Sequence, residues 1–313
     1  MSARAVSIVI PSLGDVDLLE RALPALEREL DARGGIDEIV VVDDTGDDVL
    51  RPWLAERFGR VRCIARETNG GFARALTDGV RAARGPLVFA MNPDVVPRLG
   101  FLGPLAQCLD DETVFAAAPR MLLRGDERRD ESWTGVRFVD GVVDVVQPAL
   151  EPATAAPDEP TPIAFAVGGA CMLRRDELLE RGFDPLFEPF YLEDVDLCWS
   201  AWRAGRTVLY QPASVVEHHH RGTIGRVVDL SVALAALERN RLLFQWKQLD
   251  GARLDEHVAS LYRRAIDAWL GDDRDELVWL CLALERLDEA LAARAAAPAP
   301  RRDCETILRE LEL

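Results

Sequence analysis

One short segment of the chain carries three carboxylates that could take part in proton transfer. They are Glu193, Asp194 and Asp196, and their neighbours over 190–199 are mostly aromatic or apolar. Apolar surroundings raise the pKa of a carboxyl group toward the range that suits a general base. The segment is also a predicted helix start, where the helix dipole alone favours acidic side chains. Because apolar residues lie on both sides, we favour a functional site over a solvated helix end.

Polar residues also follow three predicted strands at the points where the strands end. These ends read Pro11-Ser12, Asp43-Asp44 and Asn92-Pro93-Asp94. In open α/β sheets, ligands bind outside the carboxyl ends of the strands, so the three ends would line one edge and could form a site. Any one aspartate is better explained as a turn former or helix cap. Three such ends together favour the site.

Two further runs have residue types that bind ligands. Asn69-Gly70-Gly71 precedes a predicted helix, and its glycines would let the backbone approach a ligand closely. An ordinary loop explains that run equally well. Three histidines occupy 218–220, and a strand would place His218 and His220 on the same side. Neutral imidazole binds divalent metals, and a partly exposed polar strand end is the alternative.

These residues need a scaffold, and the apolar pattern of the first third predicts one of alternating strands and helices. Leucines at helical spacing over 17–30 follow a short β-branched run over 6–10. Such alternation is typical of βαβ units with a mostly parallel sheet, and so of an α/β fold. The predicted strands are 6–10, 38–42, 61–65, 86–91 and 113–118, and the predicted helices are 17–30, 72–83 and 99–109.

The pattern changes after residue 120 and again near residue 227. Asp140-Gly141 lies between two β-branched runs and predicts a hairpin over 136–146. The other predicted elements are a charged loop at 124–131, a long loop at 147–162, a helix at 194–204, strands at 207–210 and 214–217, and helices from 229 onward with a linker at 295–301. We therefore expect one domain over 1–226, in halves 1–120 and 121–226, and a helical extension over 227–313.

Composition excludes several classes of protein. The 313 residues include 54 acidic and 37 basic ones, a formal charge of −17 that argues against nucleic-acid binding. An anionic substrate would therefore need a local positive charge, such as a metal ion. The glycine motifs of dinucleotide-binding and P-loop enzymes do not occur. Six cysteines without a CxxC pair favour the cytoplasm, and the lack of an 18-residue apolar run predicts no transmembrane segment.

Taken in order, these segments resemble the family 2 glycosyltransferases, which have the GT-A fold and use nucleotide-diphosphate sugars. The resemblance extends from Val6 to about Thr223 and is closest to the bacterial rhamnosyltransferase-like branch. It implies a GT-A fold, with a Rossmann-like, mostly parallel sheet and flanking helices, followed by the helical extension. The segments that carry it are 6–11, 41–44, 69–73, 92–94, 168–170, 183–184 and 193–197.

The resemblance also implies roles for the polar residues. Asp94 would hold Mg²⁺ or Mn²⁺ against the diphosphate, with His218 as a further ligand and His220 as its alternative. Asp194 would be the general base for the acceptor hydroxyl, supported by Glu193, and direct attack would invert the anomeric centre. The half 1–120 would bind the donor and the half 121–226 the acceptor. The residues expected to contact the nucleotide sugar are Pro11, Ser12, Asp43, Asp44, Asn69, Gly70, Gly71, Asn92, Asp94 and Gly169.

Some positions depart from the family's pattern and leave alternatives open. Asn92 replaces the first aspartate of the usual DxD motif, and Thr77 and Ser200 stand where the family often has Asn and Arg. The nucleoside contact stays open between Asp43 and Asp44. These departures allow a second hypothesis, a binding or scaffold protein that keeps the fold without turnover. A sugar-phosphate nucleotidylyltransferase is disfavoured, because residues 11–15 lack that class's glycine-rich loop with Arg and Lys.

The expected partners follow from the glycosyltransferase hypothesis. They are a nucleotide-diphosphate sugar donor and a glycan or lipid-linked acceptor, as in the assembly of envelope polysaccharides. For the helical extension we expect core packing or a homodimer contact. Docking at the inner face of the cell membrane is the alternative, although the acidic residues of the extension weaken attraction to anionic lipid.

Overall fold

The computed structural model describes residues 4–124, 126–147, 157–219 and 229–313. It divides into two compact units. The sheet unit comprises Met1–Thr134, Gln147–Gly182 and Thr207–Arg221, and the helical unit comprises Gly135–Val146, Phe183–Arg206 and Gly222–Leu313. The hairpin and the segment 183–206 group with the C-terminal helices in the helical unit. The domain boundary expected at residue 226 stays a prediction.

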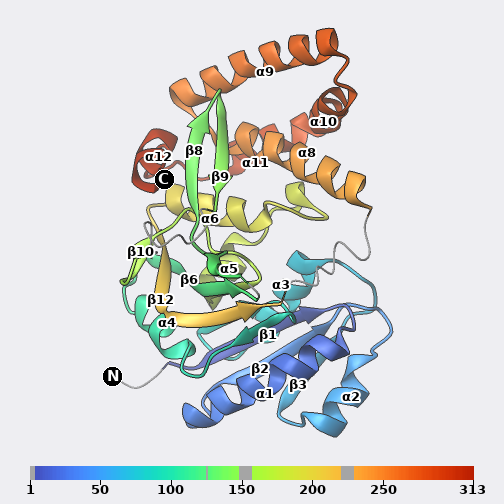
Figure 1. Cartoon of the computed structure of the whole chain (residues 1–313), viewed down its shortest axis with the longest axis vertical. Coiled ribbons are helices and arrows are strands. Elements are labelled where there is room, and N and C mark those ends of the chain that lie inside the picture. The colour runs from blue at the N-terminus through green and yellow to red at the C-terminus, as the bar shows by residue number, and fades with distance from the viewer. Residues whose placement is uncertain (1–3, 125, 148–156, 220–228) are drawn as a thin grey trace. The chain divides into compact units, whose positions relative to one another are not determined.

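The sheet unit is built on one large sheet (Figure 1), to which ten strands of the described residues belong. The strands are β1 (Val6–Ser12), β2 (Glu38–Asp43), β3 (Val61–Ala65), β4 (Leu87–Met91), β5 (Val95–Pro97), β6 (Val114–Leu123), β7 (Asp126–Asp130), β10 (Thr161–Pro162), β11 (Ala170–Arg174) and β12 (Thr207–His218). The order is β10-β12-β6-β11-β4-β1-β2-β3, with β5 beside β12 and β7 beside β6. In that order only β10 and β11 oppose the common direction. The predicted α/β fold with a mostly parallel sheet is confirmed.

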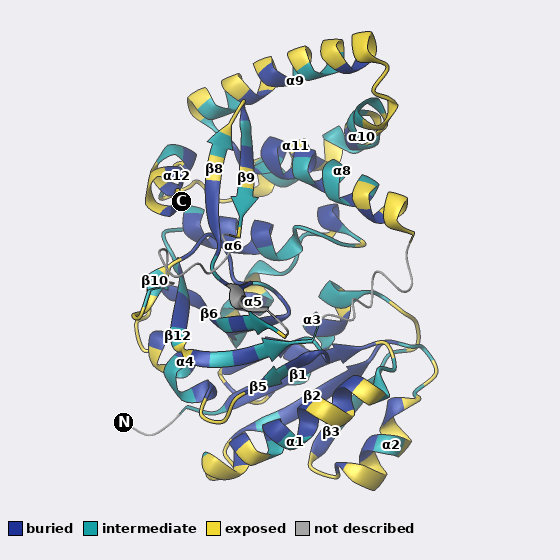
Figure 2. Ribbon diagram, in the orientation of Figure 1, coloured by how far each residue is buried: buried dark blue, intermediate teal, exposed yellow. Residues whose placement is uncertain are grey.

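Helices pack around this sheet and bury its central strands. The helices are α1 (Val16–Ala32), α2 (Leu50–Arg57), α3 (Phe72–Ala82), α4 (Leu102–Cys108) and α5 (Arg175–Arg181). Figure 2 shows the central strands as buried, and Ile8, Val9 and Ile10 of β1 are 0% exposed. A strand covered on both faces reads as a continuous apolar run, which explains the pattern seen in the sequence. Helix α3 lies directly on β1, since a Cβ on Gly79 would come within 2.3 Å of Val9.

Several elements differ from the sequence prediction. The strands expected at 207–210 and 214–217 form one strand, β12, with an irregularity between Gln211 and Val215. The segment 124–131, expected as a loop, contains β7. Helices α2 and α5 were not predicted. Helix α2 buries only Leu50 and Leu54, so it has too few apolar positions to show a helical repeat.

The helical unit combines a β-hairpin with a group of helices. Its elements are β8 (Gly135–Val139), β9 (Val142–Val146), the 3₁₀ helix η2 (Pro185–Phe187), α6 (Glu193–Arg203), α8 (Leu230–Gln248), α9 (Gly251–Gly271), α10 (Arg274–Leu284), α11 (Leu287–Ala296) and α12 (Cys304–Leu311). Asp140 and Gly141 form the two-residue turn, both with positive φ, so the predicted hairpin is confirmed. Buried His257 of α9 contacts the carbonyl of Gly141 through Nδ1 (2.7 Å), which ties this turn to the helix.

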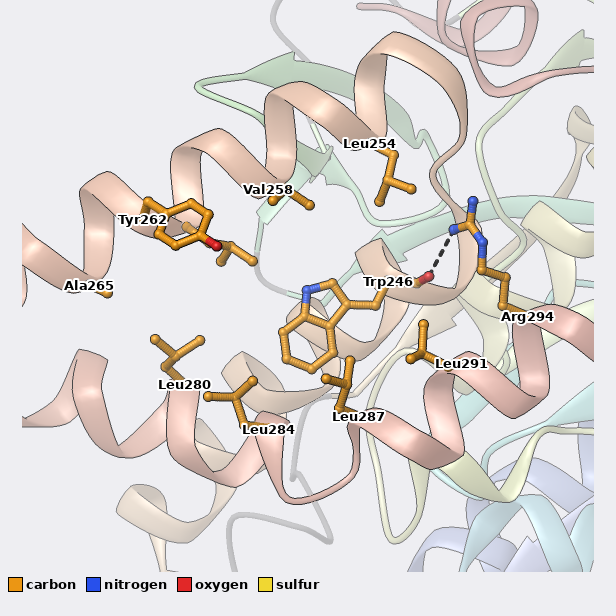
Figure 3. A pocket seen from close by; sticks show the side chains of 11 residues that line it. Trp246, Leu254, Val258, Tyr262, Ala265, Leu280, Leu284, Leu287, Leu291 and Arg294 are labelled. Carbon is orange, nitrogen blue, oxygen red and sulfur yellow. Dashed lines mark hydrogen bonds between the residues drawn. The ribbon is translucent and has the colours of Figure 1, made fainter.

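An apolar groove of about 490 Å³ opens among α8, α9, α10 and α11 (Figure 3). Trp246, Val258, Tyr262 and Leu287 are among its lining side chains, and Arg294 donates from one end to the carbonyl of Trp246. The C-terminal helices thus pack on one another, while the dimer contact and the membrane contact stay predictions. No helix in the part of the chain that the structure describes is long and apolar enough to cross a membrane.

Candidate active site

The candidate site residues of the sheet unit gather at one edge of its sheet. Ser12 ends β1, Asp43 ends β2 and His218 ends β12, and Asn92 follows β4 directly. These strands run in the same direction, so their carboxyl ends lie along the same edge. The backbone N–H of Asn92 donates to the carbonyl of Gly169 (2.8 Å), which brings Gly169 to this edge. Their roles toward a ligand stay predictions.

Asp43 and Ser12 are engaged in holding the loops at this edge. One Asp43 oxygen accepts from the N–H of Thr45 (3.1 Å) and its hydroxyl (2.6 Å), and the other accepts from the N–H of Leu50 (2.8 Å) at the start of α2. The hydroxyl of Ser12 accepts from the N–H of Asp15 (3.1 Å). Buried Pro11 precedes it in β1. Asp43 therefore shapes the loop that follows β2, as an aspartate in a turn commonly does.

Asp44 holds the glycine loop in front of α3. Its carboxylate accepts from the backbone N–H of Gly70 (3.0 Å) and Gly71 (2.9 Å), and it pairs with Arg66 (2.5 Å). The side chain of Asn69 also accepts from the N–H of Gly71 (3.0 Å). Gly71 has φ of +79°, a conformation that favours glycine. The structure thus joins two segments, Asp43-Asp44 and Asn69-Gly70-Gly71, that the sequence could only treat separately.

Asp94 and His218 form the most distinctive pair at this edge. Asp94 is 8% exposed, and its Oδ2 lies 3.4 Å from Nε2 of His218. Its other oxygen, Oδ1, is buried and has no hydrogen-bond partner among the described residues. The second ring nitrogen of His218 contacts Glu131 (2.5 Å). Burial lowers the pKa of His218, but the two carboxylates outweigh burial and raise this pKa to about 9.

The donor atoms of this pair suit a divalent cation. A carboxylate oxygen and an imidazole nitrogen both bind such ions, and Mg²⁺ in proteins usually keeps only one or two carboxylates beside phosphate oxygens and water. The observation that supports the fit is Oδ1 of Asp94, a buried oxygen to which no side chain or backbone group of the described ranges donates. Within the described ranges, no group of three or more His, Cys, Asp or Glu side chains could hold a metal by itself. The alternative ligand, His220, lies outside the described residues.

The two predicted catalytic carboxylates lie together in the helical unit. Glu193 and Asp194 occupy the first turn of α6, and Leu192 in front of them has φ of +70°. Oε2 of Glu193 is buried and has no hydrogen-bond partner in the described part of the chain. Burial, and then the charge of Asp194, raise the pKa of Glu193 to about 8. Glu193 is therefore largely protonated at neutral pH.

A buried amide on α8 holds the backbone that leads into these carboxylates. Asn240 is 0% exposed, and its Nδ2 lies within hydrogen-bond distance of the carbonyls of Phe187 (2.9 Å), Phe190 (3.1 Å) and Tyr191 (2.8 Å). Without this side chain, those carbonyls would lose a buried donor. Nothing in the spacing of the sequence pointed to Asn240, because the two segments it joins are about fifty residues apart.

The ammonium of Lys247 on α8 holds the other side of the same segment. It donates to Asp184 (2.7 Å) and to Asp196 (2.6 Å), and lies over the ring of Phe187. Burial raises the pKa of Asp196, and Lys247 acts against that rise. The carboxylates in turn raise the pKa of Lys247 despite its burial, so we treat this cluster as ionised. Asp196, the third carboxylate of the predicted cluster, thus anchors α6 to α8.

The shifted pKa of Glu193 predicts a pH-dependent stability. Its pKa rises from 4.5 in the unfolded chain to about 8 on folding, so its stabilising contribution is complete below pH 4.5 and is lost as pH rises through 8. Chemical denaturation at pH 5, 7 and 9 should therefore show a fall in the free energy of unfolding that is smaller in Glu193→Gln, while the share that His218 contributes remains. We expect Glu193 to account for about 2 kcal/mol of the fall, below the full linkage value because the side chain keeps some solvent contact. Glu180→Gln, at an exposed position, is the control, and an unchanged pH profile in Glu193→Gln would contradict the prediction.

Comparison with known proteins agrees with the resemblance to family 2 glycosyltransferases. Residues 7–182 match the model of the family Glycosyl transferase family 2. The Pre-mycofactocin glycosyltransferase of Mycobacterium tuberculosis is 28% identical over 228 residues, which cover 70% of this chain. This chain spans less than half of that relative, 44% of its length.

Solved structures share the fold. One is GalNAc-T7 with UDP, GalNAc and Mn²⁺, with a TM-score of 0.57 and 19% identity over 75% of this chain and 48% of that chain. Another is the mannosyltransferase PcManGT from Pyrobaculum calidifontis in complex with GDP-Man and Mn²⁺, with a TM-score of 0.54 and 17% identity over 93% of this chain and 85% of that chain. The sheet order, the carboxyl-edge residues and the match over more than half of the sequence lead to one conclusion: this chain belongs to glycosyltransferase family 2 and has the GT-A fold.

Proposed function

We propose that this chain transfers a sugar from a nucleotide-diphosphate sugar to a hydroxyl group of a glycan or lipid-linked acceptor, with inversion at the anomeric carbon. The observation that carries the proposal is the buried Asp94–His218 pair at the carboxyl edge, in which one carboxylate oxygen has no partner among the residues that the structure describes. Two structures that share the fold, GalNAc-T7 with UDP and PcManGT with GDP-Man, are complexes that also contain Mn²⁺. We infer a donor of that class here. The resemblance of the motifs to the rhamnosyltransferase-like branch suggests rhamnose as the sugar that is transferred.

Asp94 and His218 are the residues that would hold Mg²⁺ or Mn²⁺. When bound, such an ion neutralises the negative charge that develops on the departing nucleoside diphosphate. The net charge of −17 makes this local positive charge necessary, since the protein's own field repels an anionic donor. The N–H groups of Gly70 and Gly71 in front of α3 donate to the Asp44 carboxylate, so these glycines would border the donor rather than offer those N–H groups to its phosphates.

We assign the role of general base to Asp194. Neighbouring carboxylates commonly divide into a protonated and an ionised member when their surroundings differ. The raised pKa of Glu193 makes it the protonated member. Asp194 would then accept the proton of the acceptor hydroxyl as this oxygen attacks the anomeric carbon. Glu193 would donate a hydrogen bond to the acceptor or to Asp194.

A panel of nucleotide sugars tests this proposal. The purified chain is incubated with UDP-, GDP- and dTDP-sugars and with soluble glycan and lipid-linked acceptors, in the presence of Mn²⁺ or Mg²⁺. We expect mass spectrometry to show consumption of one donor, a matching mass gain on an acceptor, and loss of both after chelation with EDTA. Donor binding without transfer to any acceptor would favour the binding or scaffold protein instead.

A further inference from the structure

Glu131 makes a contact that no motif in the sequence indicated. Its Oε2 lies 2.5 Å from Nδ1 of His218, while Nε2 of the same ring faces Asp94. The three side chains therefore form a row in which the imidazole lies between two carboxylates. They are all nearly buried, with side chains 9%, 14% and 10% exposed for Glu131, His218 and Asp94.

The backbone holds Glu131 firmly in this place. Its N–H donates to the carbonyl of Met121 (2.9 Å), and its own carbonyl accepts from the side chain of Gln147 (2.7 Å). The neighbouring Asp130 is 1% exposed and accepts from the hydroxyl of Tyr210 (2.6 Å). These contacts fix the backbone from which the Glu131 side chain extends toward His218.

The contacts that His218 makes with Glu131 and Asp94 differ in length and in what they require of the ring. The bond to Glu131 is short and requires a proton on Nδ1, because a carboxylate only accepts. The 3.4 Å separation at Nε2 leaves that nitrogen with the weaker contact. A neutral ring with its proton on Nδ1 has its lone pair on Nε2, the atom that lies on the side of Asp94.

We propose that Glu131 is a positioning residue for a divalent cation: it holds His218 in the tautomer and orientation in which Nε2 can bind the ion together with Asp94. The proposal rests on the proposed function. A carboxylate behind a metal-binding histidine fixes the ring and strengthens it as a ligand, and loss of such a partner costs 10–100-fold in metal affinity.

Mn²⁺ binding is the direct test. Affinity is measured by electron paramagnetic resonance and calorimetry with Mn²⁺ alone and with Mn²⁺ plus UDP or GDP, on the whole chain and its variants. We expect Glu131→Ala to weaken Mn²⁺ binding by 10–100-fold and Glu131→Gln, which can still accept from Nδ1, to weaken it less. Glu217→Gln is the matched control, because this carboxylate precedes His218 in β12 and pairs instead with Arg98 (2.9 Å). We expect it to bind Mn²⁺ within twofold of the unmodified chain.

Nitrogen NMR of histidine-labelled protein gives a second readout that a general loss of stability would not produce. At pH 10, above the pKa of about 9 at which His218 loses its second proton, the unmodified chain should show this ring with its proton on Nδ1. The folded Glu131→Gln and Glu131→Ala variants should show a mixture of tautomers once their ring is neutral. Unchanged affinity and tautomer in the variants, or an equal loss in Glu217→Gln, would overturn the proposal for Glu131 alone. Absence of Mn²⁺ binding to the unmodified chain would overturn both this proposal and the metal part of the proposed function.

Discussion

Replacing Asp194 by asparagine should lower the rate of sugar transfer by about 10²–10⁴-fold, the usual contribution of a positioned general base. Asparagine keeps the size of the side chain and can still accept from the N–H of Val195, as Asp194 does (2.8 Å), so α6 should still form. It cannot accept the proton of the acceptor hydroxyl. The measurement is the initial rate of acceptor glycosylation at saturating donor. Donor binding should be nearly unchanged, since Asp194 is assigned to the acceptor's proton.

The control for Asp194→Asn is an aspartate in an equivalent position of another helix. Asp176 lies in the first turn of α5, as Asp194 lies in the first turn of α6, and its side chain is 91% exposed. Asp176→Asn removes the same charge from a helix start, so any effect of the helix dipole alone appears there as well. Transfer by Asp194→Asn at the rate of Asp176→Asn would remove Asp194 from the role of base.

Replacing Lys247 by methionine should lower the free energy of unfolding by about 3–5 kcal/mol, the usual cost of breaking a buried ion pair from one side. Methionine keeps the length and apolar stem of the side chain but leaves Asp184 and Asp196 without their cation. Asp196 is 3% exposed, so water cannot take the place of the lost ammonium. Urea denaturation at pH 7 measures the change. The loss should shrink at low pH, where protonation relieves the two carboxylates of their charge.

Arg241→Met is the matched control for Lys247→Met. Arg241 lies on the same helix and also pairs with two carboxylates, Glu238 (3.1 Å) and Asp144 (3.4 Å), but its side chain is 43% exposed. Exposed pairs contribute about 0–1 kcal/mol, so this variant should lose at most about 1 kcal/mol. Equal losses in the two variants would show that Lys247 is no more than an ordinary surface cation.

The sequence predicted those features that depend on local pattern. The run over 6–10 became the buried strand β1, and Asp140-Gly141 became the hairpin turn, because continuous apolar runs and two-residue turn signals depend on neighbouring residues. The shared edge of Ser12, Asp43 and Asn92 also followed from the pattern, because parallel strands place their carboxyl ends on the same side.

The residues that the sequence did not reveal act across long separations. Glu131 lies 87 residues before His218, and Lys247 lies 51 residues after Asp196. Neither contact produces a periodic pattern in the sequence, because each depends on how elements that are distant in the chain pack together. The charged run 124–131 was predicted as a loop for the same reason. It contains a strand only because β7 pairs with β6, and that pairing leaves no apolar pattern in the run itself.

Lys247 is the only lysine in the 313 residues, and its side chain is 9% exposed in the described structure. Reagents that acylate side-chain amines therefore find no lysine on the surface of the folded chain. Acylation at this position requires the contact between α8 and α6 to open, so the rate of labelling reports the frequency of that opening. The chain thus carries one built-in chemical probe, placed where the segment that begins with Glu193 and Asp194 is anchored.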